Sequence, residues 1–437
     1  MKRFKLSNVL SLVSRPENVQ PDKTYKLLGV HWYAKGLYIK DVRKGHEIKA
    51  KKLYKVEKGD FVYNRLFAWK GSFGLATEEV AGCYVSNEFP CFQFSNSDPE
   101  YILWLFKDEE MWDRCSELSK GSTSISRKRL KVEKLLSLDV PLPDLQQQNT
   151  LSEYFQAVES TVHILKGQLN ERSKIITDLR QSILNQAVQG KLVPQDPNDK
   201  PASVLLEKIK EEKDRLVKEK KIRKQKVLPL IEEEEIPYEI PEGWEWVRFG
   251  DVCRIVSNLV DPKEFLFLVH VAPNHIEKST GKLIDLELVS EAGLRSKKHK
   301  FNPGQIIYSK IRPNLSKLTI VDFEGVCSAD MYPIDVFINN KYVANYMLSS
   351  YFINLVTKND NRVAMPKVNQ DELNKVIVPL PPLKEQKRIV AKVDQLLSLC
   401  DQLEEQLKVS EQNTEKLLQA VLHEAFQSEE TKEAVEV

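Results

Sequence analysis

Two long stretches of the chain carry hydrophobic side chains at alternating steps of three and four residues, the spacing that places them on one face of a helix. The first stretch has Leu151, Phe155, Val158, Val162, Leu165, Leu169, Ile176, Leu179 and Ile183 at these positions, with Arg172 as an interruption. The second has Ile389, Val393, Leu396, Cys400, Leu403, Leu407, Leu417 and Val421, with Ser410 and Thr414 as interruptions. The pattern predicts a coiled-coil seam along each helix.

The length of these helices indicates how their apolar faces are buried. About 45 residues at 1.5 Å each form a rod of about 65–70 Å, longer than one small domain can cover. We therefore expect the two helices to pair with each other. The alternative is that each is an ordinary core helix of its own domain.

The sequence also contains an internal repeat, which organises the whole chain. The segment VPLPDLQQQ at 140–148 recurs as VPLPPLKEQ at 378–386, and the same offset of 238 residues continues without a gap through both helical stretches. Upstream, GDFVYNR at 59–65 is matched by GQIIYSK at 304–310. The chain is therefore two similar halves, each a block of mixed pattern followed by a Pro-rich boundary and a long helix.

The two blocks mix strand and helix patterns. Alternating positions predict strands at 48–56, 61–69 and 306–311, whereas helical spacing that ends at Gly or Asn predicts helices at 99–121 and 341–359. We expect a mixed α+β fold for each block. The expected parts are a first block at 1–143, a first long helix at 144–190, a charged connector at 191–240, a second block at 241–381, a second long helix at 382–428 and a flexible tail at 429–437.

The net charge of the 437-residue chain is only +2, which at first disfavours a nucleic-acid partner. This total is a sum over regions that differ in net charge. Residues 1–139 hold 25 basic and 18 acidic side chains, whereas residues 378–437 hold 7 basic and 12 acidic ones. The first block therefore has the charge of a phosphate-binding surface, and the acidic helix is better suited to binding protein.

Several patterns of catalysis and metal binding are missing from the sequence. The six cysteines are scattered without a CxxC pair, and no His stands at ligand spacing, so we expect buried reduced thiols and no metal site. Neither a phosphate-binding GxxxxGK[ST] loop nor a glycine-rich cofactor loop after a strand is present. We expect no catalytic residue and no cofactor in this chain. No apolar run is long enough for a membrane span, and we expect a cytoplasmic protein.

Basic, amide and hydroxyl side chains cluster with aromatics at loop-like places in both blocks, and such groups bind phosphates and base edges. A solvated loop is the alternative for each cluster. The candidate DNA-binding residues are Asn64, Arg65, Lys70, Lys120, Ser122, Thr123, Ser124, Arg127, Lys128, Lys297, Lys298, Lys310, Arg312, Asn361, Arg362, Lys367 and Asn369.

Three motifs resemble the specificity subunit of type I restriction-modification systems. They are SILNQAVQGKLVPQDPNDKPASVLLEKIK at 182–210, IPEGWEWVRFGDV at 240–252 and VPLPPLKEQKRIVAKVD at 378–394, and they occur in the order of that family. The first half departs from the family pattern twice. It has DLQQQ at 144–148 where the family has a Glu-Gln pair, and it lacks a PEGW-like opening, whose place we assign to residues 2–9.

The resemblance implies a pseudo-two-fold internal repeat with two target-recognition domains and a long antiparallel two-helix coiled coil between them. Each domain would read one half of a bipartite double-stranded DNA site, asymmetric because the two blocks differ. The chain would recruit two copies of an adenine-N6 methyltransferase subunit and, through them, the restriction and translocation subunits of a phage-defence complex. S-adenosylmethionine, ATP and magnesium are expected on those partners. The alternative is a coiled-coil scaffold protein that reads no DNA sequence.

Overall fold

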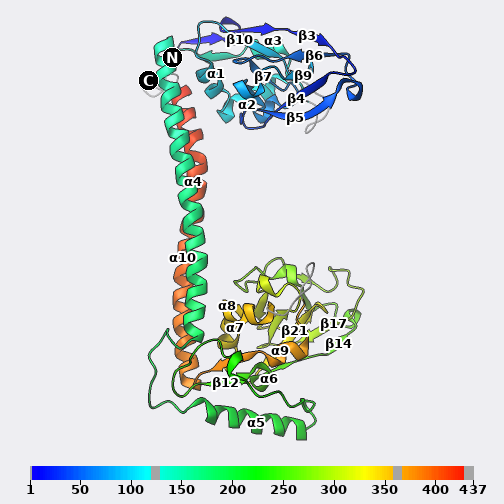
Figure 1. The fold of residues 1–437 in the computed structure, drawn as a ribbon, viewed down its shortest axis with the longest axis vertical. Helices are drawn as coiled ribbons and strands as arrows, with labels where there is room; N and C mark the ends of the chain where they lie inside the picture. The colour runs from blue at the N-terminus through cyan, green and yellow to red at the C-terminus, as the bar shows by residue number, and fades with distance from the viewer. Residues whose placement is uncertain (1, 120–127, 358–366, 428–437) are drawn as a thin grey trace. The chain divides into compact units, whose positions relative to one another are not determined.

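The computed structural model describes residues 2–119, 128–357 and 367–427 (Figure 1). The chain forms two compact units, one made of residues 1–171 and 407–437 and the other of residues 172–406. Each unit contains one block and a part of both long helices. The expected flexible tail at 429–437 lies outside the described residues.

Two sheets form the centre of the first unit. One sheet has the strand order β2 (Leu10–Val13), β10 (Cys91–Phe94), β7 (Phe61–Tyr63) and β8 (Phe73–Leu75). The other has the order β3 (Pro16–Asn18), β6 (Lys52–Lys55), β9 (Tyr84–Val85), β4 (Thr24–Val30) and β5 (Leu37–Lys44). Strands β4 and β9 are parallel, and the other pairs in these two sheets are antiparallel.

Three short helices, α1 (Pro99–Leu105), α2 (Glu109–Leu118) and α3 (Val132–Leu136), complete the first block. The single helix predicted at 99–121 is wrong, because the helix is interrupted between Leu105 and Glu109. Asp108 accepts a hydrogen bond from the Glu110 backbone amide at 3.2 Å and so caps a new helix. The strand predicted at 61–69 ends at Tyr63, where the chain turns.

The second unit repeats these sheets strand for strand. Its four-stranded sheet has the order β13 (Cys253–Ile255), β21 (Met331–Val336), β18 (Ile306–Ser309) and β19 (Leu318–Ile320). Its five-stranded sheet has the order β14 (Leu259–Val260), β17 (Lys298–Phe301), β20 (Gly325–Cys327), β15 (Val269–Val271) and β16 (Glu287–Leu288). Strands β15 and β20 are the parallel pair that corresponds to β4 and β9.

In its described residues the second block has four short helices, and the last three follow the order of α1, α2 and α3 in the first block. They are α6 (Phe249–Val252), α7 (Asn340–Leu348), α8 (Ser350–Thr357) and α9 (Gln370–Lys375). The helix predicted at 341–359 is divided at Ser349, whose buried hydroxyl donates to the Tyr346 carbonyl at 2.7 Å. A hydroxyl bonded back to the preceding turn competes with the helical backbone bonds and allows the chain to change direction.

A two-stranded sheet closes each block at the start of its long helix. Strand β1 (Arg3–Lys5) pairs with β11 (Asp139–Pro141), with Phe4 opposite Val140. Strand β12 (Glu245–Arg248) pairs in the same way with β22 (Ile377–Leu380). Residues 2–9 therefore hold the place that 240–252 hold in the second half, as the repeat predicts.

The long helices are α4 (Leu145–Val188) and α10 (Leu383–Gln427), each continuous over its length. In the first unit, Phe155 of α4 packs against Phe426 of α10 with ring centroids 5.3 Å apart. In the second unit, Arg180 of α4 donates to Glu404 of α10 at 2.9 Å and also pairs with Asp401. The start of each helix thus packs with the end of the other within its unit, which is antiparallel pairing (Figure 1).

The predicted seam residues differ in burial. Buried positions are Phe155, Val162, Leu169, Ile176, Ile183, Ile389, Val393 and Cys400, and half-buried ones are Leu151, Val158, Leu165, Leu396, Leu407 and Val421. Leu179, Leu403 and Leu417 are 43%, 44% and 41% exposed, because two paired helices cannot enclose every position of both stripes. Near the end of α10 the buried face shifts to Thr414, Leu422 and Phe426, because Leu422 and Phe426 join the core of the first block.

One glutamine ties each long helix to its own block. Gln148 accepts from the Asp98 amide at 2.9 Å and donates to the Pro143 carbonyl at 2.8 Å. Gln386, at the matching position, accepts from the Asn339 amide at 3.0 Å and donates to the Pro381 carbonyl at 2.9 Å. Asp98 and Asn339 are the N-caps of α1 and α7. The last residue of the repeated DLQQQ and PLKEQ segments therefore orients the block on its helix.

The connector contains the helix α5 (Ala202–Lys218), which contacts α6 of the second block. Arg248 joins the connector to the same block, since its guanidinium donates to Glu235 at 2.6 Å and to the Leu230 carbonyl at 2.6 Å. The connector is thus docked on the second block, and the acidic run at 232–235 contributes to this docking.

All six cysteines are buried and unpaired, as predicted. Burial raises the pKa of the Cys115 thiol to about 12, so it stays protonated. Within residues 2–119, 128–357 and 367–427, no helix has the length and apolar character needed to cross a bilayer.

Candidate DNA interface

In the first unit, the end of β7 meets the segment that leads to the long helix. The Leu130 amide donates to the Arg65 carbonyl at 2.9 Å, and the Asn64 amide donates to the Ser72 carbonyl at 3.0 Å. Arg129 pairs with Glu88 at 2.8 Å, and the Glu88 carbonyl accepts from the Arg65 amide at 3.0 Å. Two of the candidate residues, Asn64 and Arg65, are thereby placed beside the segment that begins at Lys128.

The second unit contains the same arrangement with different side chains. The Val368 amide donates to the Lys310 carbonyl at 2.9 Å, and the Lys310 amide donates to the Asp330 carbonyl at 3.0 Å. Lys367 lies 3.5 Å from Asp330, in the place of the Arg129–Glu88 pair. Each block thus has one such site. It is formed by the end of β7 and the segment before α3 in the first block, and by the end of β18 and the segment before α9 in the second. We call these the Arg65 site and the Lys310 site.

The two sites share a backbone framework but differ in their polar groups. Arg65 is half-buried, and its Nε has no hydrogen-bond partner among the described residues. The ammonium of Lys310 lies over the ring of Tyr332, 5.1 Å from the centroid. Arg312, two residues further on, is exposed in a left-handed conformation with φ of 49°. Guanidinium and ammonium groups recognise bases and phosphates differently, so the two sites are suited to different sequences.

Seven candidate residues adjoin these sites in the sequence but lie outside the described residues. They are Lys120, Ser122, Thr123, Ser124 and Arg127 in the first half and Asn361 and Arg362 in the second. Their role stays a prediction. Lys128 donates to the hydroxyl of Ser116 on α2 at 2.9 Å.

An aromatic and basic patch lies near the Arg65 site, in the hairpin between β4 and β5 and the turn that follows β7. Lys70 lies 4.0 Å from the ring centroid of Trp32 and 5.0 Å from that of Trp69. Trp32 is 41% exposed and Tyr33 is 53% exposed. The Tyr33 amide donates to the Lys70 carbonyl at 2.9 Å, which fixes the hairpin against the turn. We call Trp32, Tyr33, Trp69 and Lys70 the Trp32 patch.

Sequence reasoning found Lys70 but missed Trp32 and Tyr33. The signal was the segment HWYAKG at 31–36, which sets two large aromatics at a turn between strands. Tyr33 and Ala34 have φ of 62° and 49°, a conformation that residues other than glycine adopt uncommonly. Exposed aromatics held rigidly beside a lysine are suited to nucleic-acid contact.

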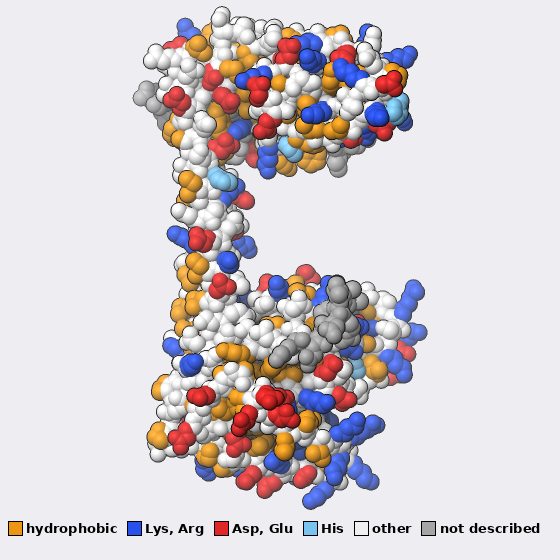
Figure 2. Space-filling view, in the orientation of Figure 1, with side chains coloured by type: hydrophobic (Ala, Val, Ile, Leu, Met, Phe, Trp, Pro, Cys, Tyr) orange, Lys and Arg blue, Asp and Glu red, His pale blue; other side chains and the backbone are white. Residues whose placement is uncertain are grey.

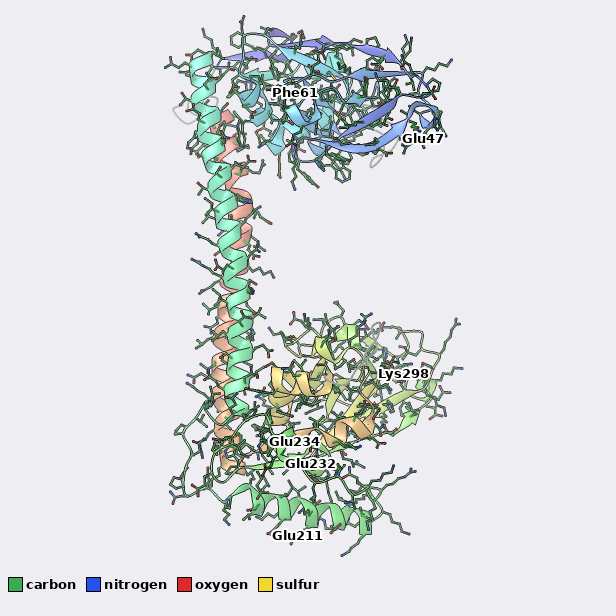
Figure 3. The ribbon with its side chains drawn as sticks, viewed as in Figure 1. Glu47, Phe61, Glu211, Glu232, Glu234 and Lys298 are labelled. Carbon is green, nitrogen blue, oxygen red and sulfur yellow. The ribbon has the colours of Figure 1, made fainter. Side chains whose placement is uncertain are left out.

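Three candidate residues have structural partners instead. Lys298 (labelled in Figure 3) is buried, and its ammonium donates to the Ser296 hydroxyl at 2.7 Å, so burial lowers its pKa. Asn369 caps α9 by accepting from the Glu372 amide at 2.8 Å. Asn64 accepts from the Leu66 amide at 3.0 Å and shapes the turn after β7. Lys297, next to Lys298, is exposed.

Basic side chains are spread over the surface of both units. On the face shown in Figure 2, Lys and Arg are interspersed with Asp and Glu over most of the surface, and several gather at the lower right of the view. Exposed basic side chains are concentrated in the connector at residues 218–226.

Two clusters in the described part of the chain bring together side chains able to ligate a metal, although no such spacing stands out in the sequence. One is His270, His275 and Glu287, and the other is Asp108, Glu110 and His423. The first cluster forms where β15 pairs with the next strand, β16, and the second forms where α10 packs beside the start of α2. The expectation that the chain lacks a metal site therefore missed these clusters.

The repeated blocks and their sites define a class of protein. Residues 23–172 and 241–410 each match the family model of the type I restriction modification DNA specificity domain. The chain belongs to this family. It is a specificity subunit. The family match supports this assignment over the alternative of a scaffold that reads no DNA sequence.

Individual relatives support the same assignment. The chain is 34% identical to the type I restriction enzyme EcoDI specificity subunit of Escherichia coli, over 76% of this chain and 70% of that protein. It is 34% identical to the EcoAI specificity subunit of the same species, over 76% of this chain and 59% of that protein. The chain thus matches less than two thirds of the EcoAI protein's length.

Two solved structures share the fold. The HsdS subunit from Thermoanaerobacter tengcongensis superposes with a TM-score of 0.58 at 16% identity, over 98% of this chain and 96% of that chain. A chain from a study of complex assembly and conformational transition of the type I R-M system gives a TM-score of 0.68 at 16% identity, over 98% and 97% of the two chains. At this identity the likeness shows the fold.

Proposed function

We propose that this specificity subunit reads an asymmetric bipartite site in double-stranded DNA, one half-site with each block. The proposal rests on the recurrence of the Arg65 site as the Lys310 site. The same backbone bonds hold both sites, whereas the side chains differ. Two similar frameworks with unlike polar groups are what a reader of two unlike half-sites needs.

An exchange of one block tests this assignment. In a chain whose residues 241–377 are replaced by the matching block of another specificity subunit, we expect one half of the methylated site to change and the other to stay. Genome-wide mapping of modified adenines, with and without the chain, gives the readout. Single substitutions at Arg312 test the same half-site in a chain that has no junctions between exchanged blocks, because this residue is exposed and lies outside the sheets. Change in both half-sites would contradict the proposal.

We also propose that the chain acts without catalysis of its own. It would dock two copies of an adenine-N6 methyltransferase subunit, which carry S-adenosylmethionine, and through them the ATP- and magnesium-dependent restriction subunits. The exposed side of the long helices supports a protein partner, because Tyr154, Ile164 and Ile175 are 53%, 59% and 58% exposed there. Purified chain with DNA and S-adenosylmethionine should methylate nothing until the methyltransferase subunit is added. Methylation by the chain alone would overturn this view.

A further inference from the structure

A cluster of two histidines and one glutamate lies at the edge of the five-stranded sheet of the second block. His270 on β15 and Glu287 on β16 are directly opposite each other in the antiparallel ladder. His275 ends the 3₁₀ turn Pro273–His275 that follows β15. The fold thus brings together three side chains from two strands and a turn.

The distances within this cluster fit a shared metal ion better than hydrogen bonds. Glu287 Oε1 lies 3.4 Å from His270 Nδ1 and 3.6 Å from His275 Nε2, and the three candidate ligand atoms all lie within 4.8 Å of one another. Charge-assisted hydrogen bonds between nitrogen and oxygen are shorter, about 2.7–2.9 Å. Ligands about 2.0–2.1 Å from a tetrahedral zinc ion stand about 3.3–3.4 Å from each other.

The backbone orients His275 for this role. Its Nδ1 lies 3.1 Å from the His270 carbonyl oxygen and 3.3 Å from the Ala272 amide nitrogen. The main chain therefore occupies Nδ1 and leaves Nε2 directed at Glu287. A metal-ligating imidazole is typically held by such a contact at its other nitrogen.

Both imidazoles of the cluster are buried, with His270 and His275 5% and 4% exposed. The nitrogen of His270 that faces Glu287 is Nδ1, so Nδ1 is the atom that would bind an ion. Its Nε2 has no hydrogen-bond partner among the described residues and would then be the protonated nitrogen of the neutral ring. Burial lowers the pKa of His270, and the neighbouring His275 and Lys298 lower it further against the opposing effect of Glu287. The neutral imidazole is the form that binds metals.

We propose that His270, His275 and Glu287 bind one divalent transition-metal ion, zinc, in the second block. Two imidazoles and one carboxylate suit zinc, whereas magnesium and calcium prefer oxygen ligands. The carboxylate is the more exposed ligand, with its side chain 38% exposed, so water can take the remaining position.

A structural role follows from the short strands at this place. Strands β15 and β16 share two ladder pairs, whereas β4 and β5 in the first block share seven. An ion held by both strands and the turn would fix the segment at 272–286, which few ladder bonds hold. This segment also reaches the long helix α10, where Lys282 lies 3.6 Å from Asp401.

Metal titration of the full-length chain tests the proposal without DNA or partner subunits. The chain is stripped with a chelator, titrated with zinc chloride, and examined for bound metal and for its thermal unfolding midpoint. We expect one bound zinc and a rise of the midpoint. Replacement of zinc by cobalt should give the intense visible absorption of a tetrahedral site.

Glu287→Gln is the decisive variant, because it keeps the size of a half-exposed side chain and removes its charge. His275→Ala is the second variant, and His163→Ala, at an exposed position on α4, is the control. We expect zinc binding to weaken at least about tenfold in the first two variants and to stay unchanged in the control. The proposal is overturned if the wild-type chain binds no zinc, or if Glu287→Gln binds zinc and shifts its midpoint as the wild type does.

Discussion

At the scale of single residues, the first half departs from the family pattern in two ways that have one cause: it lacks the Glu of the Glu-Gln pair and it lacks the PEGW-like opening. Glu385 accepts from the indole of Trp244 at 2.9 Å and from Gln195 at 3.1 Å, so it joins α10 to the PEGW segment and the connector. The matching position in α4 is Gln147, which is exposed. The first half lacks both the tryptophan and its acceptor. A glutamate there would have no indole to bind.

This contact gives a stability prediction. Glu385→Ala should lower the free energy of unfolding by about 1–3 kcal/mol, because the buried indole N–H of Trp244 loses its acceptor. Glu385→Gln should cost less, since an amide oxygen can still accept. Urea denaturation measures the change, and Gln147→Ala, at the matching exposed position, serves as the control. Equal effects of the Ala substitutions at 385 and 147 would refute this account.

Lys70 gives a prediction about DNA affinity. If the Trp32 patch lies on the DNA backbone, Lys70→Ala should weaken binding to all sequences and reduce the slope of log K against log salt by about one. Fluorescence anisotropy on duplexes at several salt concentrations gives this slope. Lys58→Ala is the matched control, because Lys58 is exposed and pairs with Glu78 at 2.8 Å. An unchanged slope for Lys70→Ala would place the patch away from phosphate.

At the scale of elements, the connector helix α5 is held by a half-buried lysine, Lys213. The Lys213 ammonium donates to the Gly250 carbonyl at 2.6 Å and lies 4.9 Å from the ring centroid of Phe337. Burial lowers its pKa from 10.5 to about 8. The amphipathic pattern of α5 predicts a helix, but only the docked structure shows that one of its lysines is desolvated.

The lowered pKa predicts how stability depends on pH. Between about pH 8 and 10.5 the folded chain has released the Lys213 proton while the unfolded chain still holds it, so stability should rise with pH in this window. Lys213→Met should remove this part of the rise, and Lys218→Met, on the exposed side of the same helix, should not. Urea midpoints at about pH 7.5 and 9.5 make the comparison. A rise unaffected by Lys213→Met would contradict the assignment.

The elements also show where sequence patterns fail. Strands of two to four residues such as β9, β16 and β20 carry too short an alternation to be recognised. Asp108 and Ser349 interrupt helices whose hydrophobic spacing continues across them. Pairing with distant strands and local capping bonds decide these cases, and neither is visible in a window of sequence.

At the scale of the whole molecule, the length of the long helices is the quantity most open to test. Helix α4 has 44 residues and α10 has 45, and both are continuous. We propose that this length sets the spacer between the half-sites. Insertion of one heptad into α4, with a matching heptad in α10, should change the spacer and leave both half-sites as they are. Mapping of methylated adenines gives the result, and a functional variant with an unchanged spacer would exclude such a ruler.

The sequence by itself determined the features that repeat or have a long period. The offset of 238 residues, the Pro-rich boundaries and the helical stripes predict two similar halves with one long helix each, because such signals accumulate over many residues. The matched segments at 59–65 and 304–310 already align Arg65 with Lys310. Only the tertiary structure decided which short strands pair, which segments lie beside these two residues, that Lys298 is buried, and that His270 meets Glu287. These facts depend on contacts between residues distant in the chain, and no local pattern of residue types encodes such contacts.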